Sequence, residues 1–177
     1  MEDNSNITIR PVSTADAGRL LEIYSYYVEE TAVSFELETP TKEEFASRIE
    51  RISKRYPYFV AEADGRIIGY AYAAQFKERA AYDKCVELTI YLDRNERRHG
   101  AGKALYGVLE NALAEKGITN LYACIGVPAE GDSDYGIDRA SERFHSRMGF
   151  TTCGEFHRCG YKFGRYYSMI WMEKLIG

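Results

Sequence analysis

Arg97-Arg98-His99-Gly100-Ala101-Gly102-Lys103 joins an apolar strand pattern to an amphipathic helix pattern. Two glycines at this junction let the backbone pass close to a ligand, and the first turn of a helix presents N–H groups that lack partners within the helix. A helix start of this kind, flanked by cations, is suited to a phosphate or pyrophosphate group. The stretch therefore predicts a phosphorylated ligand, although alone it is equally consistent with a glycine-rich turn that simply precedes a helix.

Two well-known phosphate loops do not match this stretch. A Walker loop requires Gly-Lys followed by Ser or Thr, whereas Gly102-Lys103 is followed by Ala104 and the first glycine is misplaced. The dinucleotide fingerprint requires a third glycine near the start of a β-α-β unit, and here that glycine is missing from a segment in the middle of the chain. The spacing that remains is Arg-x-x-Gly-x-Gly, from Arg97 to Gly102.

Composition indicates one globular domain over residues 1–177. The chain is 45% hydrophobic and 28% charged, and its net charge of −4 argues against a nucleic-acid partner. No run of about 18 apolar residues predicts a membrane span, and residues 1–6 are acidic and polar rather than typical of a signal peptide. The four cysteines form no Cys-x-x-Cys pair, so we expect free thiols and a cytoplasmic location.

Hydrophobic periodicity predicts a mixed α/β (α+β) fold. Strands are expected over 7–10, 58–63, 67–74, 85–92, 121–127, 152–157 and 167–173, and helices over 13–28, 40–52, 100–117 and 139–148. Residues 128–137, rich in Gly, Asp and Ser, are expected to form a loop. This order of elements favours a mixed sheet with helices on its faces.

Several motifs resemble one enzyme family. The Arg97–Gly102 spacing resembles the coenzyme A loop of the GNAT superfamily of N-acetyltransferases. Other stretches are similar to its phosphinothricin and methionine-sulfone N-acetyltransferase branch, and the similarity extends from Ile9 to Trp171. These stretches are Ala81-Tyr82-Asp83, Val86-Glu87, Thr89, Tyr91, Phe144-His145, Gly149-Phe150 and Gly160-Tyr161-Lys162-Phe163-Gly164.

The resemblance implies a twisted, mostly antiparallel sheet, about four flanking helices, and strands that splay apart at the coenzyme site. It implies acetyl-CoA as donor, a homodimer, and direct attack by an amine in a ternary complex. The residues that it assigns to the coenzyme are Ile90, Tyr91 and Leu92, whose backbone N–H groups would face the thioester oxygen, and Arg97, Arg98, His99, Gly100, Ala101, Gly102, Lys103, Asp138 and Ser141.

Glu87 and His145 are the candidate catalytic residues. Glu87 interrupts an apolar strand, where partial desolvation would raise the pKa of its carboxyl toward that of a useful base. The resemblance assigns the base to this position; the alternative is a carboxylate facing solvent or an ion-pair partner. The branch also carries histidine at the position of His145, for which a catalytic or orienting role and an ordinary structural role are both open.

An amino-acid-like acceptor carries a carboxylate that cations and phenols can bind. The resemblance implies acceptor contacts for Lys77, Arg79, Tyr82, Thr89, Lys162 and Tyr167, with Phe35 and Phe163 as apolar wall. Each of these alone is also consistent with an ordinary surface residue. Cys153, His157 and Cys159 alternate on one predicted strand, but zinc ligands more often come from a tight turn, so we expect no metal there.

Two features depart from the family pattern beside the acceptor channel. Asp138 stands where the family usually has asparagine, and residues 128–137 form a longer loop than the branch implies. Because both features lie beside the acceptor channel, the resemblance specifies the donor more closely than the acceptor. A polyamine, an aminoglycoside or a protein N-terminus therefore stays open as acceptor, as does a non-catalytic acyl-CoA-binding sensor, against which the carboxylate of Glu87 argues.

Overall fold

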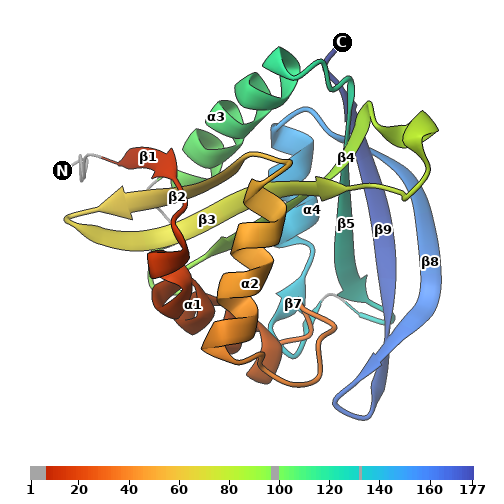
Figure 1. Cartoon of the computed structure of the whole chain (residues 1–177). Coiled ribbons are helices and arrows are strands. Elements are labelled where there is room, and N and C mark those ends of the chain that lie inside the picture. Colours follow the sequence, from red (N-terminus) through yellow and green to blue (C-terminus); the bar gives the residue numbers. More distant parts are fainter. Residues whose placement is uncertain (1–6, 97–99, 132) are drawn as a thin grey trace, which may run out of the picture.

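A computed structural model describes residues 7–96, 100–131 and 133–177. Figure 1 shows the arrangement of its elements. The strands are β1 (Thr8–Pro11), β2 (Tyr58–Ala63), β3 (Arg66–Gln75), β4 (Cys85–Leu92), β5 (Asn120–Pro128), β6 (Ser133–Asp134), β7 (Ile137–Asp138), β8 (Thr151–Lys162) and β9 (Arg165–Leu175). The α-helices are α1 (Ala17–Glu29), α2 (Lys42–Ser53), α3 (Ala101–Glu115) and α4 (Ala140–Arg147), with short 3-10 turns at Thr14–Asp16 and Ala80–Tyr82.

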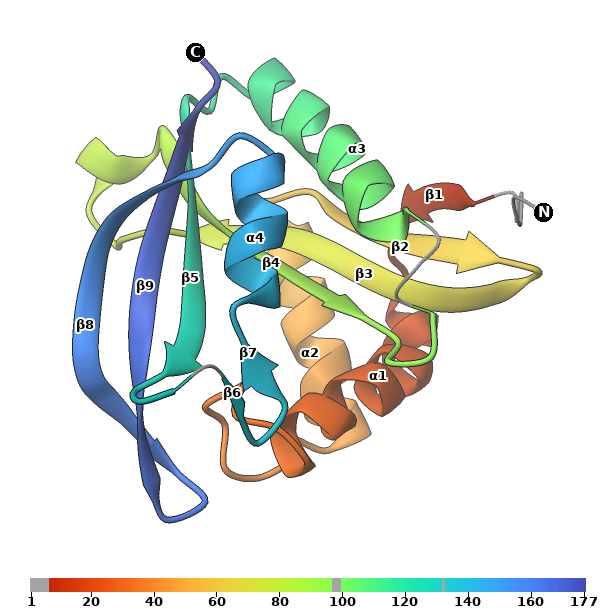
Figure 2. The same ribbon diagram turned by 180° about the vertical axis from the view of Figure 1, so that it is seen from behind.

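Seven strands form one sheet in the order β1-β2-β3-β4-β5-β9-β8. Every neighbouring pair is antiparallel except β4 and β5, which are parallel. Helices α1 and α2 cover one face, and α3 and α4 cover the other (Figures 1 and 2). These features confirm the predicted mixed, mostly antiparallel sheet with helices on its faces.

The parallel strands diverge part-way along their length. Their pairing covers three residue pairs, Cys85 to Glu87 on β4 against Asn120 to Tyr122 on β5. Beyond Glu87, β4 continues beside β3, whereas β5 continues beside β9 as far as Pro128. The sheet therefore opens between β4 and β5, as the splayed strands of the predicted fold require.

Side-chain alternation on β4 divides the hydrophobic core in two. Val86 and Leu88 are buried with the α3 side of the sheet, while Tyr91 packs among the side chains of α1 and α2. Because neighbouring side chains of a strand point to opposite faces, Glu87 and Thr89 share the α1–α2 face with Tyr91. Glu87 therefore lies on the face of the strand opposite to Val86 and Leu88.

Local chemistry explains where the helices begin. Ser13 and Asp16 form a capping box before α1, and the Thr41 hydroxyl accepts from the Glu44 N–H at the start of α2. Gly100 precedes α3 with a φ of 74°, a left-handed conformation that glycine adopts without steric cost. None of the described helices is long and apolar enough to cross a membrane.

Two predicted segments differ in the structure. Part of the expected loop 128–137 forms a small hairpin, in which β6 pairs with β7. The last two strands are longer than predicted and meet at a turn formed by Phe163 and Gly164. Strand β8 lies at the sheet edge with nearly every side chain exposed, and two bulges interrupt it, so its sequence lacks the period on which a strand prediction depends.

Candidate active site

A cleft of about 460 Å³ opens where β4 and β5 diverge. Both strands contribute to its wall, together with α1, α3, α4 and the hairpin β6–β7. In a strand, successive N–H groups point to alternate edges, so some N–H groups of β4 beyond Glu87 face the gap left by β5. The cleft thus combines an apolar channel with backbone donors on the segment Ile90-Tyr91-Leu92, which lines it.

Glu87 lies in the cleft at the last residue pair between β4 and β5. Its side chain is half-buried, and this burial raises the pKa of the carboxyl above its usual range, with the charge of Lys77 opposing the shift. A carboxylate with a raised pKa is a better proton acceptor. The position and the pKa shift are both those of a candidate general base.

His145 on α4 is buried and both of its ring nitrogens have partners. Its Nδ1 lies 2.8 Å from the carbonyl oxygen of Ser141, and its Nε2 lies 2.8 Å from the hydroxyl of Tyr106 on α3. A carbonyl oxygen only accepts, so Nδ1 carries the proton and Nε2 of the neutral ring accepts from the Tyr106 hydroxyl. This arrangement favours an orienting role for His145, in which the ring joins α3 to α4.

Burial lowers the pKa of His145. The unfolded chain therefore binds the proton more strongly, so the contribution of His145 to stability is present above the unfolded pKa of about 6.5 and is lost as pH falls below it. We expect the free energy of unfolding to fall less between pH 7.5 and 5.5 in His145→Gln than in the unsubstituted protein. Urea unfolding at both pH values measures this, and equal slopes for the two proteins would contradict the neutral, buried ring.

The start of α3 borders the cleft through Gly102. A Cβ on Gly102 would lie 3.1 Å from the ring of Phe144, which lines the cleft, so a side chain at this position would press on the cleft wall. Ala101 is buried, and Lys103 is exposed on the first turn. The predicted residues Arg97, Arg98 and His99 lie outside the described residues.

Asp138 and Ser141 line the cleft at the start of α4. Asp138 Oδ1 accepts from the Ala140 N–H at 2.6 Å, so this carboxylate stabilises the helix start. The Ser141 carbonyl accepts from His145, as described above. At the end of β4, the Tyr27 hydroxyl donates to the carbonyl oxygen of Leu92 at 2.5 Å and fixes the strand where it passes α1.

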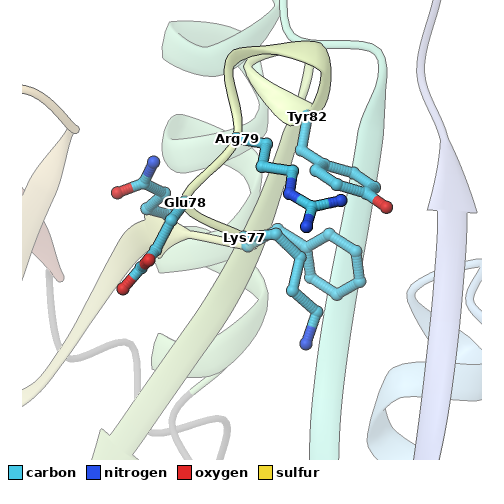
Figure 3. Close-up of a pocket in the computed structure, with 6 residues that line it drawn as sticks. Lys77, Glu78, Arg79 and Tyr82 are labelled. Atoms are coloured by element: carbon cyan, nitrogen blue, oxygen red, sulfur yellow. The ribbon is translucent and has the colours of Figure 1, made fainter.

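Lys77, Arg79 and Tyr82 surround a second hollow of about 520 Å³ after β3. Figure 3 shows Arg79 and Tyr82 on the same side of this hollow, Lys77 extending along the strand, and Glu78 pointing the other way. The Lys77 Nζ lies 5.0 Å from the centre of the Phe76 ring, which stacks on Tyr122. Thr89 lines the cleft itself. The structure therefore places a cationic, aromatic surface next to the strand that carries Glu87.

The other predicted acceptor residues lie around the β8–β9 turn. Lys162 is buried, and its Nζ donates to the carbonyl oxygens of Val28 at 2.6 Å and Ser34 at 2.7 Å. Burial lowers the pKa of this ammonium, and the charge of Glu36 opposes the shift. Because two carbonyl groups already hold it, the observed contacts of Lys162 are structural.

Tyr167 is fully buried, and its hydroxyl donates to Asp134 at 3.2 Å. Burial raises the pKa of Tyr167 to about 12. Phe163 stacks on Tyr135 at 4.7 Å. The ring of Phe35 lies next to the cleft wall: a Cβ on Gly126, which lines the cleft, would lie 3.5 Å from the Phe35 ring.

Comparison with known proteins identifies the family. A model of the acetyltransferase (GNAT) domain matches residues 9–171. The chain belongs to the GNAT acetyltransferase family.

The acetyltransferase is similar to phosphinothricin N-acetyltransferases. It is 34% identical to the one from Streptomyces viridochromogenes, over 95% of this chain and 87% of that protein. It is 28% identical to an L-methionine sulfoximine/L-methionine sulfone acetyltransferase of Pseudomonas paraeruginosa, over 94% and 92% of the two chains. The crystal structure of a Sinorhizobium meliloti phosphinothricin acetyltransferase in complex with AcCoA superposes with a TM-score of 0.87 and 33% identity, covering 97% of this chain and 89% of that one. The predicted family and branch are confirmed, and the protein is an N-acetyltransferase.

Sequence reasoning missed two residues that line the cleft of the acetyltransferase, Tyr106 and Tyr27, and one that contacts β9 beside it, Asp134. Tyr106 lies among the apolar residues of α3, so nothing in the sequence pairs it with a histidine 39 positions later. Tyr27 is one of the buried residues of α1, and its contact with β4 depends on packing across the sheet face. Asp134 lies in the expected loop, and its contacts with Arg165 and Tyr167 on β9 can be seen only in the structure.

Proposed function

We propose that this enzyme transfers the acetyl group of acetyl-CoA to the primary amine of a small amino-acid-like acceptor, of the phosphinothricin or methionine sulfone/sulfoximine type. The observation that carries the proposal is Glu87, a half-buried carboxylate of raised pKa in the gap between β4 and β5. The names of the similar enzymes support the class of acceptor.

The described residues suit a coenzyme on the α3 side of the cleft. The first-turn amides of α3, from Ala101 to Lys103, have no partner within the helix and suit a pyrophosphate. The apolar channel between β4 and β5 suits the pantetheine arm, and its backbone donors suit the thioester oxygen. Asp138 and Ser141 are proposed to border this arm, and Arg97, Arg98 and His99 remain predictions for the phosphates.

In the proposed mechanism the amine attacks acetyl-CoA directly, in a ternary complex. Glu87 accepts one proton from the acceptor ammonium, which frees the lone pair of the nitrogen. The nitrogen then bonds to the thioester carbon while N–H groups of the Ile90–Leu92 segment donate to the developing oxyanion. When the C–S bond breaks, the second proton lost by nitrogen goes to the thiolate. His145 acts as an orienting residue, because its two nitrogens are engaged by Ser141 and Tyr106.

A thiol-release assay with a panel of amines tests this proposal. Free amino acids and their sulfone or phosphinate analogues are expected to release thiol from acetyl-CoA faster than polyamines, aminoglycosides or peptides. A preference for one of those other amines would contradict the proposed class of acceptor, while the proposal that the enzyme transfers an acetyl group would stand. Coenzyme binding without thiol release for any amine would support the non-catalytic sensor instead.

The cationic surface after β3 is proposed to bind the acceptor carboxylate. A hydrogen bond to a charged group contributes about 1.5–3 kcal/mol, so Arg79→Gln is expected to raise the KM for an amino acid at least tenfold. The KM for acetyl-CoA should stay unchanged. Steady-state kinetics with the free amino acid and with its carboxamide measure this. The carboxamide has no carboxylate, so its KM should be the same for Arg79→Gln and for the unsubstituted enzyme. An equal rise for acid and carboxamide would contradict a carboxylate contact.

We also propose a homodimer in the cytoplasm, as the branch resemblance implies. The aromatic side chains of Phe156 and Tyr161 on the edge strand β8, and of Tyr166 on β9, are exposed, which supports an interface there. The four cysteines are free thiols, which is consistent with a reducing compartment.

A further inference from the structure

An aromatic cluster borders the hollow after β3. The Phe76 ring, which lines the hollow, stacks on Tyr122 with 4.3 Å between the ring centres and an interplanar angle of 16°. Trp171 and Tyr82 meet the same ring edge-on, with ring centres 5.8 Å and 6.0 Å from that of Phe76. Tyr122 belongs to β5 and Trp171 to β9, so Phe76 joins the hollow to the two strands on the far side of β4.

The ammonium group of Lys77 lies over two rings of this cluster. Its Nζ is 5.0 Å from the centre of the Phe76 ring and 6.0 Å from the centre of the Trp171 ring. A cation within about 6 Å of the face of an aromatic ring is attracted by the electron density of that face. Because the rings are neutral, they hold the ammonium without cancelling its charge, which stays available to a carboxylate.

The backbone alone does not fix the Lys77 side chain. This residue is exposed and lies between the end of β3 at Gln75 and the 3-10 turn Ala80–Tyr82, outside the described strands and helices. A free lysine side chain samples many rotamers, and binding a ligand in one of them costs conformational entropy. The two rings restrict the side chain before a ligand arrives, so the cost at the moment of binding is smaller.

The same ammonium is close to the candidate base. Burial raises the pKa of Glu87, and the charge of Lys77 opposes this rise, so the two groups lie within electrostatic range of each other. Glu87 also pairs with Tyr122, the residue on which Phe76 stacks. The amine and the carboxylate of an amino acid are attached to one carbon. A cation that binds the carboxylate while Glu87 takes a proton from the amine must therefore lie near Glu87, as Lys77 does.

We propose that Phe76 and Trp171 are positioning residues, which hold the Lys77 ammonium where it binds the carboxylate of the acceptor beside Arg79. This inference rests on the proposed function, which assigns the acceptor carboxylate to this hollow. Phe76 and Trp171 act through Lys77 and need not touch the acceptor. Their effect on acceptor binding should therefore disappear when the charge of Lys77 is removed.

A double-mutant cycle tests this dependence. Calorimetric titration gives the Kd of methionine sulfone for enzyme saturated with coenzyme A, which carries no acetyl group to transfer. Phe76→Leu removes the ring and stays apolar, while Lys77→Met removes the charge and keeps a similar length. Phe76→Leu should raise the Kd about three- to fivefold when Lys77 is present, and should leave it unchanged in the Lys77→Met background.

Further variants separate positioning from folding. Trp171→Leu should raise the Kd by a similar factor, whereas Phe76→Tyr and Trp171→Phe keep a ring at each position and should bind methionine sulfone normally. The carboxamide of methionine sulfone should bind equally well to Phe76→Leu and to the unsubstituted enzyme. Tyr56→Leu is the matched control, because the Tyr56 ring lies 5.3 Å from the Arg55 guanidinium, in a cation–π contact outside the cleft and the hollow. This control should leave the Kd unchanged.

The fluorescence of Trp171 gives a second readout, because it is the single tryptophan of the chain. A carboxylate that binds Lys77 changes the charge near the indole ring, so methionine sulfone should shift the emission of the unsubstituted enzyme. Lys77→Met should lose this shift.

An equal rise in Kd in both backgrounds of the cycle would overturn the proposal, because Phe76 would then act without Lys77. A Kd that Lys77→Met leaves unchanged would also overturn it, as would weaker binding of the carboxamide to Phe76→Leu. Failure of the proposed function gives a different result. Neither methionine sulfone nor phosphinothricin would then bind the unsubstituted enzyme, and the assignment of the hollow to the acceptor would be wrong as well.

Discussion

Glu87→Gln is expected to lower kcat/KM at pH 7 by at least about a hundredfold while leaving the Kd of acetyl-CoA unchanged. General base catalysis typically contributes 10²–10⁴-fold, and the amide is nearly isosteric with the carboxylate but accepts no proton at neutral pH. Stopped-flow thiol release measures the rate, and calorimetric titration measures coenzyme binding. The separation matters because Glu87 borders the cleft in which the coenzyme is proposed to lie.

The pH profile provides the second readout of Glu87. Burial raises the pKa of this carboxyl, and the active form is the carboxylate, so the rate of the unsubstituted enzyme should fall as pH decreases through the raised pKa. Glu87→Gln should lack this limb. A raised pKa in the folded state also means that ionisation at higher pH lowers stability, so Glu87→Gln should be at least as stable as the unsubstituted enzyme at pH 8.

A matched control is available on the same sheet. Glu173 on β9 is another half-buried strand glutamate, and it pairs with Tyr122 and Thr151 rather than facing the gap beyond β4. Glu173→Gln should keep the rate and the acidic limb. If Glu87→Gln keeps both as well, the base lies elsewhere and the cleft carboxylate is structural.

The sequence predicts most of the central sheet because hydrophobic side chains there follow regular periods. Alternation along Cys85–Leu92 is sufficient to predict the strand and both of its faces, including the placement of Glu87 with Thr89 and Tyr91. The divergence of β4 from β5 has no such signal, because both strands remain apolar past the point where their pairing ends. That feature was expected only from the family resemblance.

Prediction from sequence is weakest where contacts join distant segments. Lys162 resembles an acceptor ligand in the sequence, but the structure packs it between carbonyl groups more than 120 positions away. A sequence pattern does not reveal this, because a lysine near a surface turn is ordinarily exposed. The hairpin β6–β7 is similar: its Gly and Asp residues predict a turn, while the contacts that position it come from β9 and the connection after α1.

Gly102 is expected to be the most sensitive position on the coenzyme side. A Cβ there would meet two atoms of the Phe144 ring at 3.1 and 3.2 Å and Ile90 at 3.6 Å, and both neighbours line the cleft. Overpacking of this kind costs about 1–3 kcal/mol. If the strain is relieved by pushing Phe144 into the channel, that cost appears in coenzyme binding. We therefore expect Gly102→Ala to weaken acetyl-CoA binding about tenfold, and Gly102→Val about a hundredfold.

Gly107 gives the matched control on the same helix, since a Cβ there would have no neighbour within 4 Å. Replacing glycine by alanine in a helix interior stabilises it by about 0.5–1 kcal/mol, and this gain should appear in the melting temperature of Gly107→Ala with an unchanged Kd for acetyl-CoA. Calorimetric titration and thermal unfolding of both variants separate the two effects. Equal acetyl-CoA affinity in Gly102→Ala and Gly107→Ala would mean that α3 absorbs the extra methyl by moving away from Phe144. The glycine before Lys103 would then serve helix packing rather than the coenzyme channel.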